Sequence, residues 1–321
     1  MANSSNNLKI KNIKSCDICV IGSGAGAGPV IYELVKAGLQ VTVLEKGGWF
    51  DEQDFKKDEM LTRKNCFKSK IADERHILST PDDHHLASEN EWHDDTTSEF
   101  WGGNIVGGAS NFMSGYFHRL KPQDFRLLSE FGKIEGANIT DWPISYEDLE
   151  PYYTKVESLI GVSGKIVQHP FLEPRTTPDY PFPPTAEHPV ASWFDKAANE
   201  LGYHPLPMAR AILSQPYNSR NSCEYSGYCG SYGCRSGAKG SSRAALIDSV
   251  KHHDNFNLIT YAKAYHINTD QKGNASSVDY FDRQGNSQRI EAKAVVVACY
   301  AIESARLLLS SAGSKHPDGI G

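Results

Sequence analysis

The fold of this 321-residue chain is decided by one stretch near its start, Asp17-Ile18-Cys19-Val20-Ile21-Gly22-Ser23-Gly24-Ala25-Gly26-Ala27-Gly28. A β-branched apolar run ends in a glycine-rich turn, and a helical pattern then continues through Val35 to a stop signal at Gly38. Val41-Thr42-Val43-Leu44 follows as a second strand that ends in Glu45. This order of strand, glycine turn, helix and strand predicts the beginning of a parallel sheet in an α/β protein.

The glycine turn matches the dinucleotide-binding pattern G-x-G-x-x-G/A at Gly22, Gly24 and Ala27. The first glycine permits the tight turn, the second lets the backbone approach a pyrophosphate, and Ala27 is small enough for close packing of helix on strand. Glu45 stands where a carboxylate accepts hydrogen bonds from an adenosine ribose. A glycine turn that binds nothing is the alternative, but the flanking strands and helix favour a nucleotide site.

The sheet is expected to resume far along the chain. Ala294-Val295-Val296-Val297-Ala298 is a continuous apolar run typical of a buried parallel strand, and a helix is predicted from Ala301 to Leu309. About 250 residues separate this strand from Glu45, whereas a two-lobed NAD-binding fold continues with regular βα units. The long interruption favours FAD over NAD.

Composition and charge exclude several classes of function. The chain has 33 basic and 39 acidic side chains, a net charge of −6 and 39% hydrophobic residues, as expected for a packed enzyme-sized protein. Its scattered lysines and arginines argue against nucleic acid or an anionic membrane as the main partner. No segment has the continuous apolar character of a spanning helix. Residues 1–14 are predicted to be a disordered tail without an export signal, which suggests the cytoplasm.

The remaining pattern is less regular. Residues 51–95 are predicted to form long loops, and the seven prolines from Pro170 to Pro189 mark an extended connection. Ser145 and Asp148 have the spacing of a capping box, and Pro151 suits the first turn of a helix. The other expected elements are a helical face of Tyr152, Val156 and Leu159, a helix from Trp193 to Leu201, and strands at Leu258–Ile267, Ser277–Phe281 and near Ile290.

A second glycine-rich element runs from Trp101 to Asn111. Its small residues would let a planar ring or a diphosphate lie against the backbone. A flexible surface loop explains the composition equally well.

Several motifs together resemble the glucose-methanol-choline (GMC) family of flavin oxidoreductases. The motifs are Asp17–Gly24, Val43–Gly48, Val106–Ser110, Arg119–Phe125, Asp141–Tyr146 with Leu149–Tyr153, and Ala301–Ser304 with Arg306–Leu309. The tryptophan-proline segment and the cysteine cluster resemble the branch that contains gluconate and sugar dehydrogenase flavoprotein subunits. Tyr300 and Phe112 depart from the family pattern, since relatives often have glycine or asparagine at the first position and histidine at the second.

The resemblance implies an α/β (α+β overall) architecture. Its main part is a Rossmann-like FAD-binding domain with an interrupted parallel sheet, and part of a substrate or cap domain accompanies it. We expect residues 15–130 and 241–321 to form the discontinuous FAD-binding domain and residues 131–240 the cap segment. The implied FAD contacts are Gly22, Ser23, Gly24, Ala25, Gly26, Ala27, Glu45, Lys46, Val106, Gly107, Gly108, Ala109, Ser110, Asn111 and Ala264.

Three cysteines, Cys223, Cys229 and Cys234, are closely spaced in a glycine-rich segment. They resemble the region that carries an iron–sulfur cluster in sugar dehydrogenase relatives, and three thiolates can hold a three-iron cluster. A zinc site lacks an evident fourth ligand, because Ser226 stands where other relatives place a cysteine. Thiols without a metal are the third possibility.

The family chemistry implied by the resemblance is oxidation of a CH–OH group, in which a base removes the hydroxyl proton and a hydride passes to the flavin. The family's catalytic histidine belongs to a segment beyond the strand and helix at Ala294–Leu309. This chain ends shortly after them, so it is expected to lack that segment, and none of its histidines is assigned the role. His84, His85, His118, His252 and His253 are expected to be solvated loop residues. A flavin-binding or electron-transfer fragment without catalysis is the alternative function.

The partners implied by the resemblance are an alcohol, sugar or sugar acid as substrate, a small accessory subunit, and a cytochrome c-type electron acceptor. Export with such a subunit would place the protein in the periplasm.

Overall fold

The computed structural model describes residues 14–58, 103–170 and 172–320, and two compact units are distinguished within the chain. Unit 1 comprises residues 1–114, 227–235 and 241–321, and unit 2 comprises residues 115–226 and 236–240. The expected division placed 115–130 with the first domain and 227–235 with the second. Residues 115–130 join unit 2 because Ala211 N donates to Gly115 O (2.7 Å), and 227–235 join unit 1 because Ser231 N donates to Phe112 O (2.9 Å).

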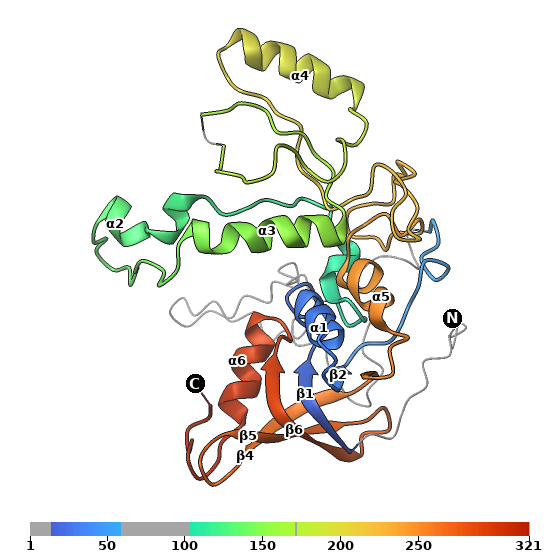
Figure 1. Ribbon diagram of the computed structural model, residues 1–321, viewed down its shortest axis with the longest axis vertical. Coiled ribbons are helices and arrows are strands. Elements are labelled where there is room, and N and C mark those ends of the chain that lie inside the picture. The colour runs from blue at the N-terminus through green and yellow to red at the C-terminus, as the bar shows by residue number, and fades with distance from the viewer. Residues whose placement is uncertain (1–13, 59–102, 171, 321) are drawn as a thin grey trace, which may run out of the picture. The chain divides into compact units, whose positions relative to one another are not determined.

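Unit 1 is built on a six-stranded sheet with the order β3-β2-β1-β6-β5-β4 (Figure 1). Strands β3, β2, β1 and β6 are parallel, and β5 and β4 are added as antiparallel strands. The strands are β1 (Ser15–Ile21), β2 (Val41–Glu45), β3 (Phe256–Thr260), β4 (Lys263–Thr269), β5 (Ala275–Phe281) and β6 (Ser287–Val297). The helical elements of this unit are α1 (Ala27–Lys36), η3 (Gly108–Phe112), the π-helical turn η5 (Ser242–Ile247), α5 (Asp248–Val250) and α6 (Ala301–Ser310).

An early and a late segment of the chain pair in the centre of this sheet. Strand β6 lies beside β1, with Ile21 opposite Val297, although some 270 residues separate them (Figure 1). The α/β fold and the return of the chain to its first sheet are therefore confirmed. The expected single strand Leu258–Ile267 was wrong: Tyr261 and Ala262 separate two strands, and β3 pairs in parallel with β2 whereas β4 runs antiparallel to β5.

Two apolar clusters hold the sheet in place. Val20, Ile31 and Val43 belong to a cluster between the sheet and α1, while Cys19 and Ile21 belong to a second cluster with Leu307 of α6. Alternate residues of β1 thus enter different clusters, because side chains alternate across a strand. The apolar run of β6 was expected to be fully buried, but Val295, Val296 and Val297 are only partly buried, and among the described strands β1 alone pairs with this part of β6.

Unit 2 contains η4 (Pro122–Phe125), α2 (Leu127–Phe131), α3 (Tyr146–Ile160) and α4 (Pro189–Glu200). The capping box at Ser145 and Asp148 is present, so α3 begins one turn earlier than Pro151 suggested. The expected apolar face is present only in part, since Val156 and Leu159 are partly buried. Tyr152 is exposed, and the buried positions of α3 include Glu150 and Glu157, because these carboxylates bind a buried arginine.

That arginine is Arg119, whose side chain is almost fully buried. Its Nε and Nη2 both donate to Glu157 (2.8 Å each), and Nη1 donates to Glu150 (2.9 Å). The pKa of Glu150 lies at about 2, since hydrogen bonds from Thr176, Arg119 and Thr154 outweigh the effect of burial. A charged and fully paired cluster therefore takes the place of an apolar helix face.

The helix expected at Trp193–Leu201 begins earlier, at Pro189, and Trp193 is exposed. Among the described residues, no helix combines the length and the apolar character needed to cross a membrane. The predicted tail and most of residues 51–95 lie outside the described ranges.

Candidate nucleotide-binding site

The glycine turn between β1 and α1 is held by hydrogen bonds to three other segments. Ser23 Oγ donates to Glu45 Oε2 (2.5 Å) and accepts from Gly107 N (3.0 Å), while Ser242 Oγ donates to Ser23 O (2.8 Å). Ser23 therefore connects the turn to the end of β2, to the second glycine-rich element and to η5. The turn is pre-organised rather than mobile.

Gly22 is required by both conformation and space. Its φ is +93°, and a Cβ atom at this position would lie 2.5 Å from the carbonyl oxygen of Ala298. The turn after β1 and the turn after β6 are thus in backbone contact. By contrast, a Cβ on Gly24 or Gly26 would meet no atom within 4 Å. These two glycines leave open space beside the backbone, as a ligand-binding turn requires.

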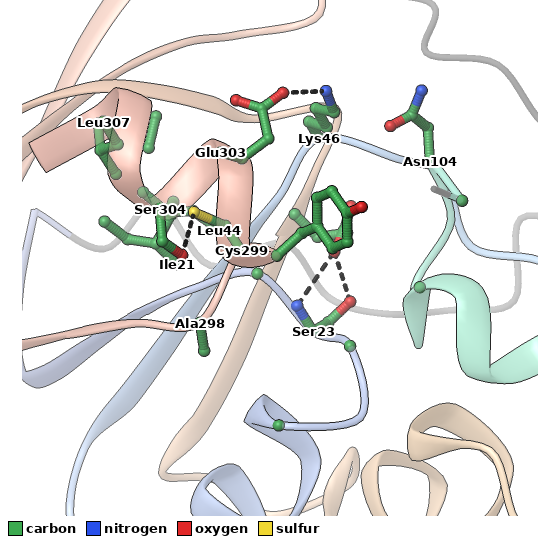
Figure 2. A pocket seen from close by; sticks show the side chains of 18 of the residues that line it. Ile21, Ser23, Leu44, Lys46, Asn104, Ala298, Cys299, Glu303, Ser304 and Leu307 are labelled. Atoms are coloured by element: carbon green, nitrogen blue, oxygen red, sulfur yellow. Dashed lines mark hydrogen bonds and ion pairs between the residues drawn. The ribbon is translucent and has the colours of Figure 1, made fainter. Parts of the chain in front are cut away.

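A cavity of about 480 Å³ lies against this turn, within the size range of small-molecule sites (Figure 2). The glycine-rich segment with Asn104 borders it on one side, and Ser304 and Leu307 of α6 border it on the other (Figure 2). Eleven of the fifteen predicted FAD contacts line the cavity: Gly22, Ser23, Gly24, Ala25, Gly26, Glu45, Lys46, Gly108, Ala109, Ser110 and Ala264.

The other four predicted contacts, Ala27, Val106, Gly107 and Asn111, are not among the lining residues. They support the walls instead. Gly107 binds Ser23, and Asn111 Nδ2 donates to the carbonyls of Val106 and Gly108 (2.9 Å each). Ile105 and Val106 are fully buried, so the described part of the second glycine-rich element is an ordered wall of the cavity and not a surface loop.

Glu45 is the buried acid of the site. Oε1 accepts from Gly47 N (2.8 Å), and Oε2 accepts from both the N–H and the hydroxyl of Ser23. Burial raises the pKa of this carboxyl, and the hydrogen bonds from Ser23 and Gly47 oppose that effect. Because each carboxylate oxygen has two lone-pair directions, Oε1 still has the capacity to accept from a ligand hydroxyl.

Lys46 and Glu303, a cation and an acid, also line the cavity. Lys46 Nζ lies 3.1 Å from Glu303 Oε1, and Arg306 Nε donates to Glu303 Oε2 (2.7 Å). Burial raises the pKa of Glu303, but Lys46 and Arg306 outweigh it and the net shift is downward. The sequence reasoning missed Glu303 as a site residue. A carboxylate in the first turn of the helix after the last parallel strand was the available signal.

Asn104 was also missed. The residue is 5% exposed and lines the cavity, and its Nδ2 donor has no hydrogen-bond partner among the described residues. Its backbone is fixed, because Ile105 pairs with Gly48 and a Cβ on Gly47 would lie 2.1 Å from the Asn104 carbonyl carbon. A buried donor without a partner carries a desolvation penalty that a bound acceptor would remove.

The described residues give no support for a metal site at the cysteine cluster. Cys223 belongs to unit 2, where its N–H donates to Leu213 O (2.9 Å). Cys229 and Cys234 lie in residues 227–235, which are part of unit 1. The described residues include all three cysteines, yet they contain no group of three or more histidine, cysteine, aspartate or glutamate side chains placed to hold a metal ion. The iron–sulfur prediction is therefore not supported.

No histidine of the described residues lines the cavity. His118 is exposed and stacks on Tyr116, and His252 and His253 are in the turn after α5. His84 and His85 lie outside the described residues.

Comparison with known proteins relates the chain to one group of enzymes. Residues 184–321 match the family model described as GMC oxidoreductase. The chain is 32% identical over 311 residues to the 6'''-hydroxyparomomycin C oxidase of Streptomyces lividus. The matched region covers 95% of this chain and 52% of that protein. It is also 32% identical to the 2-methyl-1,2-propanediol dehydrogenase of Mycolicibacterium austroafricanum (95% and 52% covered) and 28% identical to the gluconate 2-dehydrogenase flavoprotein of Pantoea cypripedii (93% and 53%).

Solved structures agree on the fold. Pyridoxine 4-oxidase from Mesorbium loti superposes with a TM-score of 0.55 at 17% identity, covering 92% of this chain and 52% of that one. A formate oxidase of Aspergillus oryzae does so with a TM-score of 0.55 at 15% identity, covering 94% and 48%. The chain thus spans about half the length of the relatives it matches.

Proposed function

The chain belongs to the GMC oxidoreductase family, and we propose that it forms the FAD-binding part of an enzyme that oxidises the hydroxyl-bearing carbon of an alcohol, sugar or sugar acid. The names of its relatives, oxidases and dehydrogenases of hydroxylated compounds, support this proposal over a flavin-binding fragment without catalysis. Because the chain spans half of those proteins, substrate and electron acceptor are proposed only as classes.

The residues around the cavity fit FAD. The open backbone at Gly24 and Gly26 leaves room for a pyrophosphate at the beginning of α1, where the positive end of the helix dipole favours an anion. Glu45 would accept from the adenosine ribose, and Ala264 on β4 would lie against the adenine. The unpartnered Nδ2 of Asn104 offers a donor to an acceptor atom of the cofactor.

The chain's own residues would bind and orient the cofactor. Bound FAD supplies the hydride acceptor for oxidation of the alcohol carbon. Ser23 holds the turn against Glu45 and Gly107, so the cavity keeps its shape before the cofactor enters. Lys46 is held by Glu303, which places its charge at the border of the cavity. The base that removes the substrate proton is not assigned to any described residue.

The proposal depends most on the open space at Gly24, which lies in the same turn as the tightly packed Gly22. A methyl group at this position meets no protein atom, so Gly24→Ala should leave the apoprotein fold intact. The same methyl group would occupy the space that the pyrophosphate needs, so FAD binding should weaken by roughly a hundredfold, the equivalent of about 2.7 kcal/mol.

The test is FAD titration of the purified 321-residue chain, followed by quenching of flavin fluorescence, with thermal unfolding of the apoprotein in parallel. Gly227→Ala is the matched control, since a Cβ there also meets no atom within 4 Å and Gly227 does not line the cavity. Failure of the unchanged chain to bind FAD, or equal binding by the Gly24 and Gly227 variants, would contradict the proposal. Bleaching of the bound flavin by alcohols, diols or sugars then tests the oxidation step.

A further inference from the structure

Tyr300 is the most strained residue of the cavity wall. It precedes α6 with φ +79° and ψ 147°. This conformation lies at the border of a region that glycine occupies readily, and for a bulky L-residue it is a genuine outlier. A tyrosine persists in such a conformation only where the surrounding structure imposes it, and such positions concentrate at functional sites.

The backbone on both sides of Tyr300 explains how the conformation is held. Two residues earlier, Ala298 is in backbone contact with Gly22 and its N–H donates to Ile21 O (2.9 Å). On the other side, Ser304 N donates to Tyr300 O (2.8 Å), and this hydrogen bond lies in the first turn of α6. The backbone changes direction between the end of β6 and the helix, and Tyr300 adopts its positive φ at this point.

The side chain gains no evident compensation within the protein. Tyr300 lines the cavity, and 45% of its surface is exposed. Within the described part of the chain, its hydroxyl forms no hydrogen bond and its ring has no aromatic or cationic partner. A tyrosine that is strained and half-exposed at a binding cavity offers an aromatic face and a hydroxyl to a ligand.

We infer that Tyr300 is a binding residue that packs its ring against the bound dinucleotide, and that the strained backbone is retained for this contact. The inference rests on the proposed binding of FAD and names a specific contact for it. Glycine would satisfy the backbone at this position without strain, so the ring is the property that distinguishes tyrosine here.

Two substitutions separate the ring from the strain. Tyr300→Gly removes both, whereas Tyr300→Ala removes the ring and keeps a Cβ at a φ of +79°. Tyr300→Gly should therefore raise the melting temperature of the apoprotein, and Tyr300→Ala should not. Both should weaken FAD binding by the same factor, roughly tenfold for the loss of one aromatic contact. Tyr300→Phe keeps the ring and should retain most of the affinity.

The measurements are FAD dissociation constants from fluorescence titration and melting temperatures of the apoproteins. Tyr225→Gly is the control, because Tyr225 is a tyrosine at φ +51° in unit 2 that does not line the cavity. The Tyr225→Gly substitution should change the melting temperature of the apoprotein without changing its affinity for FAD. If Tyr300→Gly binds FAD as tightly as or more tightly than the unchanged chain, the ring is a bystander or an obstruction and the inference fails. If the unchanged chain binds no FAD, the proposed function itself fails.

Discussion

Ser23 and Glu45 form a buried hydrogen bond of 2.5 Å that joins the glycine turn to the end of β2. The two residues are 22 positions apart, and both line the cavity. The serine hydroxyl also accepts from Gly107 N, so one side chain links an acid, a turn and a cavity wall.

Replacing Ser23 by alanine should destabilise the apoprotein. Glu45 would lose a donor and the buried N–H of Gly107 would lose its acceptor, which together cost about 1 to 3 kcal/mol. The measurement is urea unfolding of both proteins. Ser129→Ala is the control, because Ser129 donates to Asp141 on the exposed surface and should matter much less. Equal effects of the two substitutions would contradict the linking role of Ser23.

Glu45 should make the apoprotein less stable as the pH rises. Burial raises its pKa above the ordinary value of 4.5, so the native state binds more protons than the unfolded state between 4.5 and the raised pKa. Its contribution is therefore most favourable at low pH and declines through that interval. Glu45→Gln has no such titration. The difference in unfolding free energy between the two apoproteins, measured from pH 4 to pH 8, should shift in favour of the glutamine variant as the pH rises. A difference independent of pH would contradict the assignment.

Asn104→Leu should have opposite effects on stability and binding. Leucine has a similar size and removes the unpartnered Nδ2, so the apoprotein should gain about 1 kcal/mol. FAD binding should weaken, since the cofactor would lose a buried donor. Thermal unfolding and fluorescence titration measure the two effects. A variant that is destabilised and binds FAD normally would show that Asn104 serves only the fold.

Arg119→Met should strongly destabilise unit 2. The substitution leaves Glu150 without its cation and leaves Glu157 paired with Arg175 alone, and breaking a buried ion pair in this way costs about 3 to 5 kcal/mol. Arg289→Met is the matched control, since Arg289 pairs with Asp279 from a largely exposed position and should have a far smaller effect. Chemical unfolding of both variants tests the difference. Similar losses for the two would mean that the Arg119 cluster is no more than a surface ion pair in energetic terms.

The sequence predicted the centre of unit 1 well because its signals are local. The run from Asp17 to Gly28 contains a complete strand, turn and helix beginning, and Ala294–Ala298 carries enough β-branched residues to indicate a parallel strand. Eleven cavity residues followed from these motifs and from the family resemblance.

Features that depend on distant partners were less predictable. The buried face of α3 was missed, because Glu150 and Glu157 are buried only where Arg119 meets them. The break between β3 and β4 was missed, because the Tyr261 amide donates to Gly47 O at the end of β2. The spacing of the three cysteines suggested a common ligand, but the chain assigns them to different units.

The contact between Gly22 and Ala298 also bears on the synthesis of the protein. β6 begins at Ser287 and the turn after it closes against Gly22, so both are translated long after the glycine turn that follows β1. Until β6 is made, the nascent chain leaves one edge of β1 unpaired, and unpaired strand edges favour aggregation. The cavity is therefore built from segments that lie far apart in the sequence, and its wall at α6 is added after its wall at the glycine turn.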